Sequence, residues 1–532
     1  MPKMTGGQAL AKSLIREGVK VIFGLPGVQL YHAVDAIAQE PGIRFITTRH
    51  EQATAYMADG YARASGEIGT AMVVPGPGLL NASAAIGTAF AASSPTLMVA
   101  GQVQRDLIGV ERGILHEVND QMEAIKQVTK AAYRVLDPAE IPATVHEAFR
   151  QLRTGRPRPV EIEIPPETFS DEADIDLLEP GSYGREGAPK AQVEEAARIL
   201  AASKNPLIWA GGGVLSSGAT DALTHLAEHL QAPVMVTPEG KGAISDRHYL
   251  SWGTLKTRED ALRDRLPEHD VILAVGTRFA TANPVAGQRV VQIDVDPEEL
   301  GRNFADTFGV LGDARATLEA LGAELAATSS ARESQQAAHE AFRAERFGPE
   351  LRLEPLDGYI NAIRAAMPDD GILVAGMTQV GYYSRVFYPV YEPRTYLNSS
   401  YFGNLGFAYP VALGAKVARP NSPVVAISGD GGFLFNSQEL ATAVQYGINA
   451  IVVVFNDNAY GNVRRDQKNR FQGRILGSDL HNPDFVKLAE AYGARGVLAD
   501  SPQALQSAIV EAIGIEAPTL IEVPMEETPS PF

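Results

Sequence analysis

The sequence predicts an α/β fold of three consecutive doubly wound domains, each built around a parallel sheet. Short, continuously apolar runs of strand length recur along the chain, and Ala-rich helical stretches separate them. Strands that are apolar on both faces must be covered by helices on both faces, as in parallel sheets. This pattern occurs three times, with a polar stretch after each of the first two sets.

The strands and helices of the three sets can be placed by residue number. The first set of predicted strands comprises residues 19–23, 44–48, 70–74 and 96–100, with helices expected at 52–64 and 80–92. The second set comprises residues 206–210, 232–236, 271–275 and 290–294. The third comprises residues 371–375, 424–428, 450–455 and 519–523.

Two polar stretches separate the sets. Residues 172–192 are rich in Pro and Gly and predict a linker. Residues 328–353 are charged and Ala-rich, which fits an extended helix as well as a linker. We therefore expect a first domain at 1–175, a central domain at 190–330 and a third domain at 350–532.

Composition narrows the possible functions. Apolar residues make up 45% of the 532 residues, so the chain is globular rather than disordered. The 64 acidic residues outnumber the 46 basic ones, which argues against nucleic-acid binding. The absence of cysteine excludes disulfides, thiol catalysis and Cys-ligated metals. No apolar run is long enough for a membrane span and the start lacks a signal-peptide pattern, so we expect a cytoplasmic protein.

The strongest functional signal lies at residues 429–461. The strand at 424–428 runs into Gly429-Asp430-Gly431-Gly432, a helix is expected at 436–446, and the strand at 450–455 runs into Asn456-Asp457. Ligands bind at the carboxyl ends of parallel strands, where glycines let backbone N–H groups approach a phosphate. Asp430 and Asp457 would add two carboxylates there, which indicates a cation such as Mg²⁺ between them. The alternative is a pair of ordinary tight turns.

This spacing, Gly429-Asp430-Gly431 and then Asn456-Asp457 after residues 432–455, resembles the cofactor and metal signature of thiamine-diphosphate-dependent enzymes. The resemblance implies that Asp430, Asp457 and the carbonyl of Ala459 are Mg²⁺ ligands. The family usually has Asn at the position of Asp457; Asp keeps an oxygen ligand and adds negative charge.

A second motif resembles the catalytic-Glu segment of the same family. It comprises Arg49-His50-Glu51 and continues through Met57-Ala58-Asp59-Gly60-Tyr61-Ala62-Arg63. The resemblance implies that Glu51 hydrogen-bonds N1′ of the cofactor pyrimidine and relays a proton. Taken without the resemblance, Glu51 fits an ordinary helix N-terminal charge.

A third segment, residues 396–406, resembles the part of the family that supports the bent cofactor from below. Leu405 takes the position of the bulky apolar residue there, and the resemblance implies that this residue holds the cofactor in its bent shape. The complete set of residues that we expect to bind the cofactor is Pro26, Gly27, Glu51, Asn81, Gln379, Asn404, Leu405, Gly429, Asp430, Gly431, Gly432, Asp457, Tyr460, Gly461 and Asn462.

Within the family the chain looks most like the acetolactate synthase group. Phe23-Gly24-Leu25-Pro26-Gly27 and Pro75-Gly76-Pro77-Gly78 with Asn81 have counterparts there. That group carries a structural FAD in its central domain. Residues 276–283 keep Arg278-Phe279 but lack the group's Asp-Asp-Arg-Val-Thr-Gly continuation. We therefore do not predict FAD, and Gly211-Gly212-Gly213 fits a phosphate turn or a packing turn equally.

His116 stands where the group carries a substrate-side Gln. It is our second candidate catalytic residue, as a proton shuttle or a hydrogen-bond donor to the bound intermediate. A structural or surface histidine fits equally well. The residues expected to line the substrate pocket are Pro26, Gly27, Gln29, His116, Gln121, Gln379, Tyr382, Asn462 and Arg465.

The resemblance implies 2-oxoacid decarboxylation with thiamine diphosphate and Mg²⁺, followed by carboligation of the enamine to a second carbonyl compound. The alternatives are a simple 2-oxoacid decarboxylase of benzoylformate or pyruvate type, an acyl-transfer enzyme, and a catalytically silent cofactor-binding homologue. The cofactor of the family bridges two subunits, so we expect a homodimer as the minimum and a homotetramer as the assembly. We expect no nucleic-acid or membrane partner.

Overall fold

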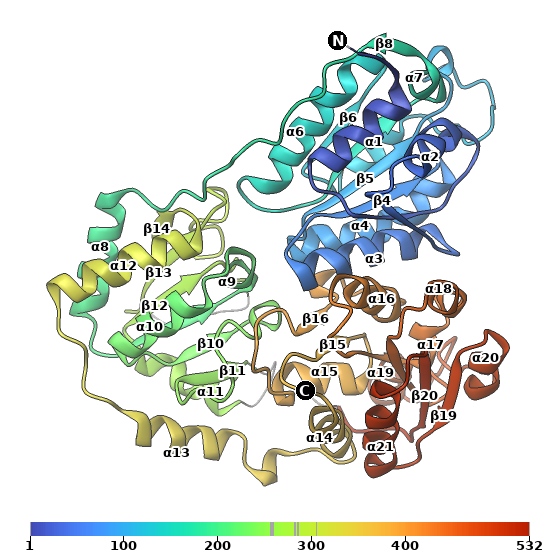
Figure 1. Cartoon of the computed structure of the whole chain (residues 1–532). Coiled ribbons are helices and arrows are strands. Elements are labelled where there is room, and N and C mark those ends of the chain that lie inside the picture. The colour runs from blue at the N-terminus through green and yellow to red at the C-terminus, as the bar shows by residue number, and fades with distance from the viewer. Residues whose placement is uncertain (1, 256–259, 281–283, 285–286, 305, 531–532) are drawn as a thin grey trace.

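The computed structural model describes residues 2–255, 260–280, 284, 287–304 and 306–530, and it confirms the predicted α/β class. Three sheets follow one another along the chain, each with six strands among the described residues (Figure 1). Every neighbouring pair of strands within these sheets is parallel. Among the described helices, none has the length and apolar character needed to cross a membrane.

The first sheet has the strand order β3-β2-β4-β5-β7-β6. Its strands are β2 (Val21–Gly24), β3 (Arg44–Thr47), β4 (Gly69–Val73), β5 (Thr96–Gly101), β6 (Ala131–Arg134) and β7 (Val160–Ile164). The helices of this part are α1 (Gly6–Arg16), α2 (Tyr31–Ala38), α3 (Glu51–Ser65), α4 (Pro77–Ala92), α5 (Gln121–Lys126), α6 (Ile141–Arg153) and α7 (Pro166–Ser170).

The second sheet has the order β11-β10-β9-β12-β13-β14. Its strands are β9 (Pro206–Ala210), β10 (Val234–Val236), β11 (Ser251–Thr254), β12 (Val271–Val275), β13 (Arg289–Asp294) and β14 (Thr307–Leu311). The helices here are α8 (Lys190–Ala202), α9 (Gly212–Ser217), α10 (Thr220–Leu230), α11 (Ala261–Arg265) and α12 (Ala314–Thr328).

The third sheet has the order β16-β15-β17-β18-β20-β19. Its strands are β15 (Ile372–Ala375), β16 (Tyr396–Asn398), β17 (Val424–Gly429), β18 (Ile451–Asn456), β19 (Arg495–Leu498) and β20 (Thr519–Pro524). The helices are α14 (Leu356–Ala366), α15 (Gln379–Phe387), α16 (Ala408–Ala418), α17 (Asp430–Phe433), α18 (Glu439–Tyr446), α19 (Gly461–Arg470), α20 (Phe485–Ala491) and α21 (Pro502–Ile513).

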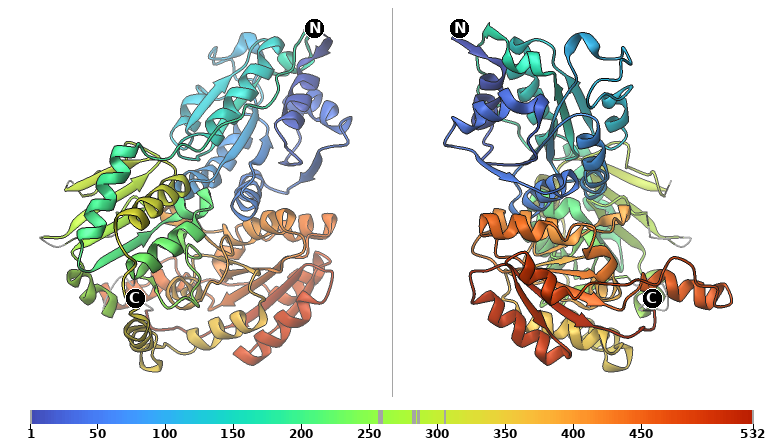
Figure 2. Two further views of the ribbon diagram at one scale, coloured as in Figure 1. Left: turned by 60° about the vertical axis from the view of Figure 1, so that its left-hand side comes forward. Right: turned by 90° about the vertical axis from the view of Figure 1, so that its right-hand side faces the viewer.

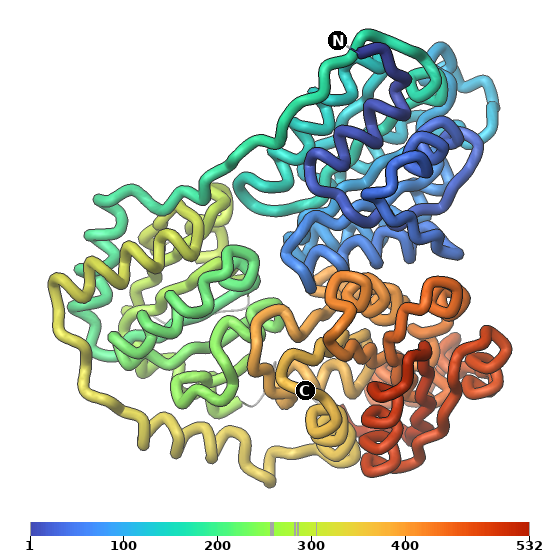
Figure 3. The backbone as a smooth tube through the Cα atoms, in the orientation of Figure 1, coloured from blue at the N-terminus to red at the C-terminus, as the bar shows by residue number. Residues whose placement is uncertain are grey.

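The two polar stretches differ from each other in structure. After β8 (Glu172–Asp174), which pairs with β1 (Lys3–Thr5), the chain runs without regular structure to α8. The second stretch contains a separate helix, α13 (Gln336–Arg346), along the outer edge of the molecule (Figure 3). Arg346 at the end of α13 is buried and forms an ion pair with Asp260, which fastens this helix to the central part.

Strand β7 shows why some elements were missed from the sequence. Its residues alternate Val160-Glu161-Ile162-Glu163-Ile164, a pattern typical of a half-exposed strand, yet all five are buried. Glu163 accepts hydrogen bonds from Arg134 of the neighbouring β6 and from Gln121. Burial and the neighbouring Glu163 raise the pKa of Glu161 well above its usual range.

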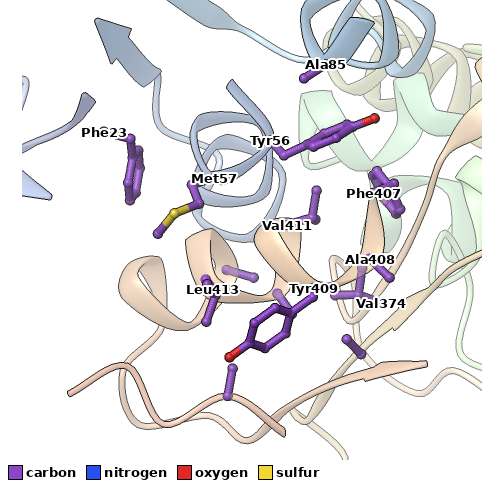
Figure 4. Packing of buried hydrophobic residues seen from close by; sticks show 14 of the residues in the cluster. Phe23, Tyr56, Met57, Ala85, Val374, Phe407, Ala408, Tyr409, Val411 and Leu413 are labelled. Atoms are coloured by element: carbon purple, nitrogen blue, oxygen red, sulfur yellow. The ribbon is translucent and has the colours of Figure 1, made fainter. Parts of the chain in front are cut away.

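The first and third parts of the chain lie against each other (Figure 2) and share one hydrophobic core (Figure 4). Helix α3 crosses α16 so closely that a Cβ on Gly60 would lie 2.1 Å from the Val411 carbonyl oxygen, and one on Gly414 would lie 1.9 Å from that of Met57. Around this crossing, Tyr56 packs edge-on against Phe407 with ring centroids 5.8 Å apart. Only glycine permits such an approach of two helix backbones.

Gly414→Ala should therefore destabilise the protein by about 2 kcal/mol, because the added methyl group overpacks the crossing. The matched control is Gly322→Ala on α12, where a Cβ meets nothing within 4 Å. It should be neutral or stabilise by about 0.5–1 kcal/mol, since alanine is the better helix former. Chemical denaturation measures both, and equal effects of the two substitutions would contradict the proposed close packing.

Candidate active site

The carboxyl ends of β17 and β18 bring Asp430 and Asp457 together. Asp430 is buried, and its Oδ1 accepts a hydrogen bond from the Gly431 N–H at 2.8 Å. Burial raises the pKa of Asp430. Burial and the charge of Asp430 raise the pKa of Asp457 to about 6. The two carboxyls thus repel each other, and a cation between them would remove this cost.

The main chain of Ala459 faces the same site. Residues 458–460 pair with 478–480 through Tyr460 N–H to Ser478 O and Leu480 N–H to Asn458 O, so Ala459 is the non-hydrogen-bonded member of the bridge. In such a pair both the N–H and the carbonyl of the central residue point away from the partner strand. The N–H of Ala459 meets Asp430 Oδ2 at 3.3 Å, which puts its carbonyl on the side of the carboxylates.

Asn482 is a site residue that the sequence did not reveal. Its Nδ2 donates to Asp430 Oδ2 at 2.6 Å and to Asn456 Oδ1 at 2.9 Å. Among the described residues, no group of three or more His, Asp or Glu side chains could hold a metal. The polar groups that meet here are the carboxyls of Asp430 and Asp457, the main chain of Ala459 and the amide side chain of Asn482. Asn482 follows no strand and has no glycine motif beside it, so no local signal marks it.

The flanking glycines serve close packing around these groups. A Cβ on Gly461, at the start of α19, would lie 2.1 Å from Asp457 Oδ2, and one on Gly431 would lie 2.6 Å from the Tyr460 ring. Gly432 lies next to Leu405, with 3.8 Å between the position of a Cβ and Leu405 Cδ2. Gly429 ends β17 in extended backbone beside Thr378.

Two further predicted residues meet each other beside this site. Gln379, at the start of α15, donates from Nε2 to Asn462 Oδ1 at 3.3 Å, and Arg465 donates to the same oxygen. Gln379 Oε1 is buried without a hydrogen-bond partner among the described residues. By contrast, the side-chain amide of Asn404 links the third domain to the first. Its Nδ2 donates to Tyr56 Oη at 2.9 Å and to the Ala84 carbonyl at 2.8 Å.

A second group of predicted residues lies at the carboxyl edge of the first sheet. Glu51 begins α3 and is half-buried, and its Oε2 accepts a hydrogen bond from Asn81 Nδ2 at 3.1 Å. Helix α4, which carries Asn81, begins after Gly76, whose φ is +57°. The Gly76 N–H donates to buried Gln121 Oε1 at 2.8 Å, which fixes this turn.

Pro26 is exposed, and Gly27 packs on the turn after β4: a Cβ on Gly27 would lie 2.5 Å from Val74 Cγ1. His116 lies in the loop before α5, with a φ of +70°. Its Nδ1 is 3.0 Å from Gln29 Oε1, and Gln29 Nε2 in turn donates to the Leu115 carbonyl. His116 therefore adjoins the 26–29 turn, as expected for a pocket residue, but no hydrogen bond joins it to Glu51 among the described residues.

The Gly211-Gly212-Gly213 turn is closely packed, since a Cβ on Gly213 would lie 2.5 Å from the Gly276 Cα. The same turn borders a cavity of about 1310 Å³ between the central part and its two neighbours. Burial raises the pKa of Asp294, at the end of β13 in this cavity, to about 6. Residues 281–283 of the stretch compared with acetolactate synthases lie outside the described residues.

The chain matches known proteins along its length. Models of the thiamine pyrophosphate enzyme family match at 4–124 (N-terminal TPP binding domain), 193–321 (central domain) and 376–523 (C-terminal TPP binding domain). A probable acetolactate synthase large subunit from Methanocaldococcus jannaschii is 35% identical, over 98% of this chain and 92% of that protein. The acetolactate synthase isozyme 3 large subunit from Escherichia coli is 32% identical, over 96% and 93%.

A probable 2-ketoarginine decarboxylase, AruI, from Pseudomonas aeruginosa is 34% identical, over 98% of this chain and 94% of that protein. With the three sheets and the three matching domains, these similarities establish that the chain belongs to the thiamine pyrophosphate enzyme family. Within that family it is an acetolactate synthase-like enzyme, dependent on thiamine pyrophosphate (thiamine diphosphate).

The burial of Asp457, together with the nearby charge of Asp430, gives a testable pH dependence. Because the pKa of Asp457 rises from 3.8 to about 6 on folding, the protein loses stability as pH rises through this range. In the absence of metal, Asp457→Asn should stabilise the protein by about 1 kcal/mol at pH 7, after allowance for solvent screening. The gain should shrink toward pH 4, where the folded wild type is already neutral at this position.

Urea unfolding in chelator at pH 4 and pH 7 measures this difference. Asp466→Asn, an exposed aspartate on α19, is the matched control and should show no comparable gain. A gain from Asp457→Asn that is the same at both pH values would contradict the raised pKa of Asp457.

Proposed function

We propose that the protein decarboxylates a 2-oxoacid and joins the remaining acyl unit to a second carbonyl compound, with thiamine diphosphate and Mg²⁺. The observation that carries the proposal is the meeting of Asp430, Asp457 and the main chain of Ala459 at the ends of β17 and β18. These groups fit Mg²⁺, because it prefers oxygen ligands and supplies the countercharge that the two carboxyls lack.

Thiamine diphosphate, when bound, supplies a nucleophilic carbon and an electron sink for the loss of CO₂. Asp430, Asp457 and the Ala459 carbonyl would hold the metal against the diphosphate, with Gly429, Gly431 and Gly432 leaving room for the phosphate oxygens. Gln379, Tyr460, Gly461 and Asn462 would border this half of the site, which their contacts with one another and with Gly431 and Asp457 support. Leu405, beside Gly432, would support the cofactor sterically.

Glu51 would share a proton with N1′ of the pyrimidine, and Asn81 would hold its carboxyl in place through the 3.1 Å hydrogen bond. Pro26 and Gly27 would border the pyrimidine from the neighbouring turn. His116, held by Gln29, would donate to the reacting carbonyl or carry a proton on the substrate side.

We propose a homodimer as the smallest active unit, in which Glu51 of one chain faces the metal site of the other, and a homotetramer as the assembly. Exposed apolar side chains beside both halves support an interface there. Leu80 is 47% exposed next to Asn81, and Val463 is 52% exposed next to Asn462. Apolar groups at these positions are more stable when a second subunit covers them.

A simple 2-oxoacid decarboxylase is the second candidate, because the related AruI is named a 2-ketoarginine decarboxylase. The test uses purified protein with Mg²⁺, thiamine diphosphate and a panel of 2-oxoacids that includes pyruvate, with CO₂ release and product identification. We expect an acyloin or acetohydroxyacid. If aldehyde is the only product, the enzyme is a simple decarboxylase rather than a carboligase. An acyl phosphate or a free acid as product would indicate acyl transfer. No activity with any 2-oxoacid of the panel would overturn the proposal.

Glu51→Gln should retain thiamine diphosphate but lose about 10²–10⁴-fold in kcat, because the amide cannot exchange the proton with N1′. Calorimetry of cofactor binding and steady-state kinetics measure the two effects. Glu67→Gln, an exposed glutamate beyond the end of α3, is the control and should leave both quantities unchanged. Turnover near the wild-type rate in Glu51→Gln would remove Glu51 from the catalytic role.

A further inference from the structure

Helix α18 of the third domain docks on the β3–α3 junction of the first domain, the segment that leads directly into Glu51. Tyr446 Oη accepts from the Thr47 N–H at 3.0 Å, and Gln445 Oε1 accepts from Arg49 Nη2 at 2.9 Å. Just before α18, Asn436 Nδ2 donates to Gln52 Oε1 at 3.0 Å. The β3–α3 junction is thus held by α18, and the first turn of α3 is held by the turn that precedes α18.

Glu439 lies at the centre of this contact. Its side chain is fully buried, and both carboxyl oxygens accept from the backbone N–H of Arg49, at 3.1 and 3.2 Å. Thr442 Oγ1 donates to Glu439 Oε2 at 2.6 Å. A buried carboxyl that binds main-chain N–H groups fixes the path of that main chain, because leaving the donors without a partner would cost free energy.

We propose that Glu439 is a positioning residue that fixes the entry into α3 and thereby aims Glu51, so that turnover depends on the ionisation of Glu439. The inference rests on the proposed role of Glu51. Among the described residues, the hydrogen bonds of the Glu439 carboxyl go to Arg49 and Thr442, and none joins it to Asp430 or Asp457. Glu439 would act on Glu51 indirectly, by holding the main chain of Arg49 and His50, the two residues that precede Glu51.

The surroundings of Glu439 place the ionisation of its carboxyl near neutral pH. Burial raises its pKa to about 7, while the Thr442 hydroxyl and the N–H groups of Arg49 and His50 lower it. The charged or titratable groups that face it are Arg49 and His50 from the junction and Tyr409 from α16. The Arg49 guanidinium donates a hydrogen bond to Gln445, and its charge also lowers the pKa of Glu439. The ionised carboxylate forms the stronger, charge-assisted hydrogen bonds to the junction.

Turnover should therefore rise with pH through an ionisation near pH 7. The experiment compares kcat against pH for wild type, Glu439→Gln and Thr442→Val, with Glu490→Gln on α20 as an exposed control. Glu439→Gln should lose this ionisation because its amide does not titrate. Thr442→Val should move it upward by about half a pH unit or more, because the lost hydroxyl favours the ionised form. The control should keep the wild-type profile.

Two further readouts separate positioning from a general structural role. Hydrogen exchange of the peptide that spans residues 49–57 should be at least tenfold faster in Glu439→Ala and near wild type in Glu439→Gln. The Kd for thiamine diphosphate should stay within threefold in Glu439→Gln while its pH profile changes. Glu439→Gln with an unchanged pH profile would overturn the inference, as would Glu439→Ala with unchanged exchange at 49–57.

The exchange measurement needs no turnover, so it distinguishes failure of the two proposals. If the wild type is silent with every 2-oxoacid, the proposed function fails, and exchange at 49–57 measured between pH 6 and pH 8 still decides the inference. Protection in wild type that rises with pH beyond the intrinsic exchange rate, and does not rise in Glu439→Gln, supports it. The same dependence in both proteins contradicts it.

Discussion

The structure depends on one unfavourable arrangement, two aspartates held side by side at the ends of neighbouring parallel strands. Asp430 and Asp457 directly follow β17 and β18, two strands that pair with each other. Burial and mutual charge raise the pKa of Asp457, so the folded chain holds them together at a cost in stability. Such a cost is typical of functional sites, and a divalent cation bound with a diphosphate would supply the missing countercharge.

The second constraint is the close crossing of α3 and α16. It joins the domain that carries Glu51 to the domain that carries the aspartates, through Gly60 and Gly414. The hydrogen bonds from α18 to the β3–α3 junction lie beside this crossing, in the shared core. A rigid contact of this kind makes the aim of Glu51 sensitive to groups outside its own domain, which is the basis of the role inferred for Glu439.

Much of the fold and part of the site could be predicted because they rest on local pattern. Continuous apolar runs identified the strands with helices on both faces, and the glycines and aspartates at 429–457 stand directly after such strands. The elements that were missed carry a misleading pattern. Strand β7 alternates Glu with apolar residues, and Gln121 and Arg134 come from elsewhere in the chain to meet the buried Glu163. The helix expected at 436–446 begins only at Glu439, because Asn436 bonds to Gln52 and Gly406.

The sequence by itself determined the class of fold and four strands of each sheet, and it predicted the carboxylates of a cofactor site, because spacing along a strand–helix–strand unit is a local property. Only the tertiary structure decided which amide and carboxyl groups hydrogen-bond to the site residues and to the main chain beside them. Asn482 reaches Asp430 across 52 positions and Glu439 reaches Arg49 across 390. Such partners depend on how the sheets and domains pack, and no periodicity of the chain records a contact between residues so far apart.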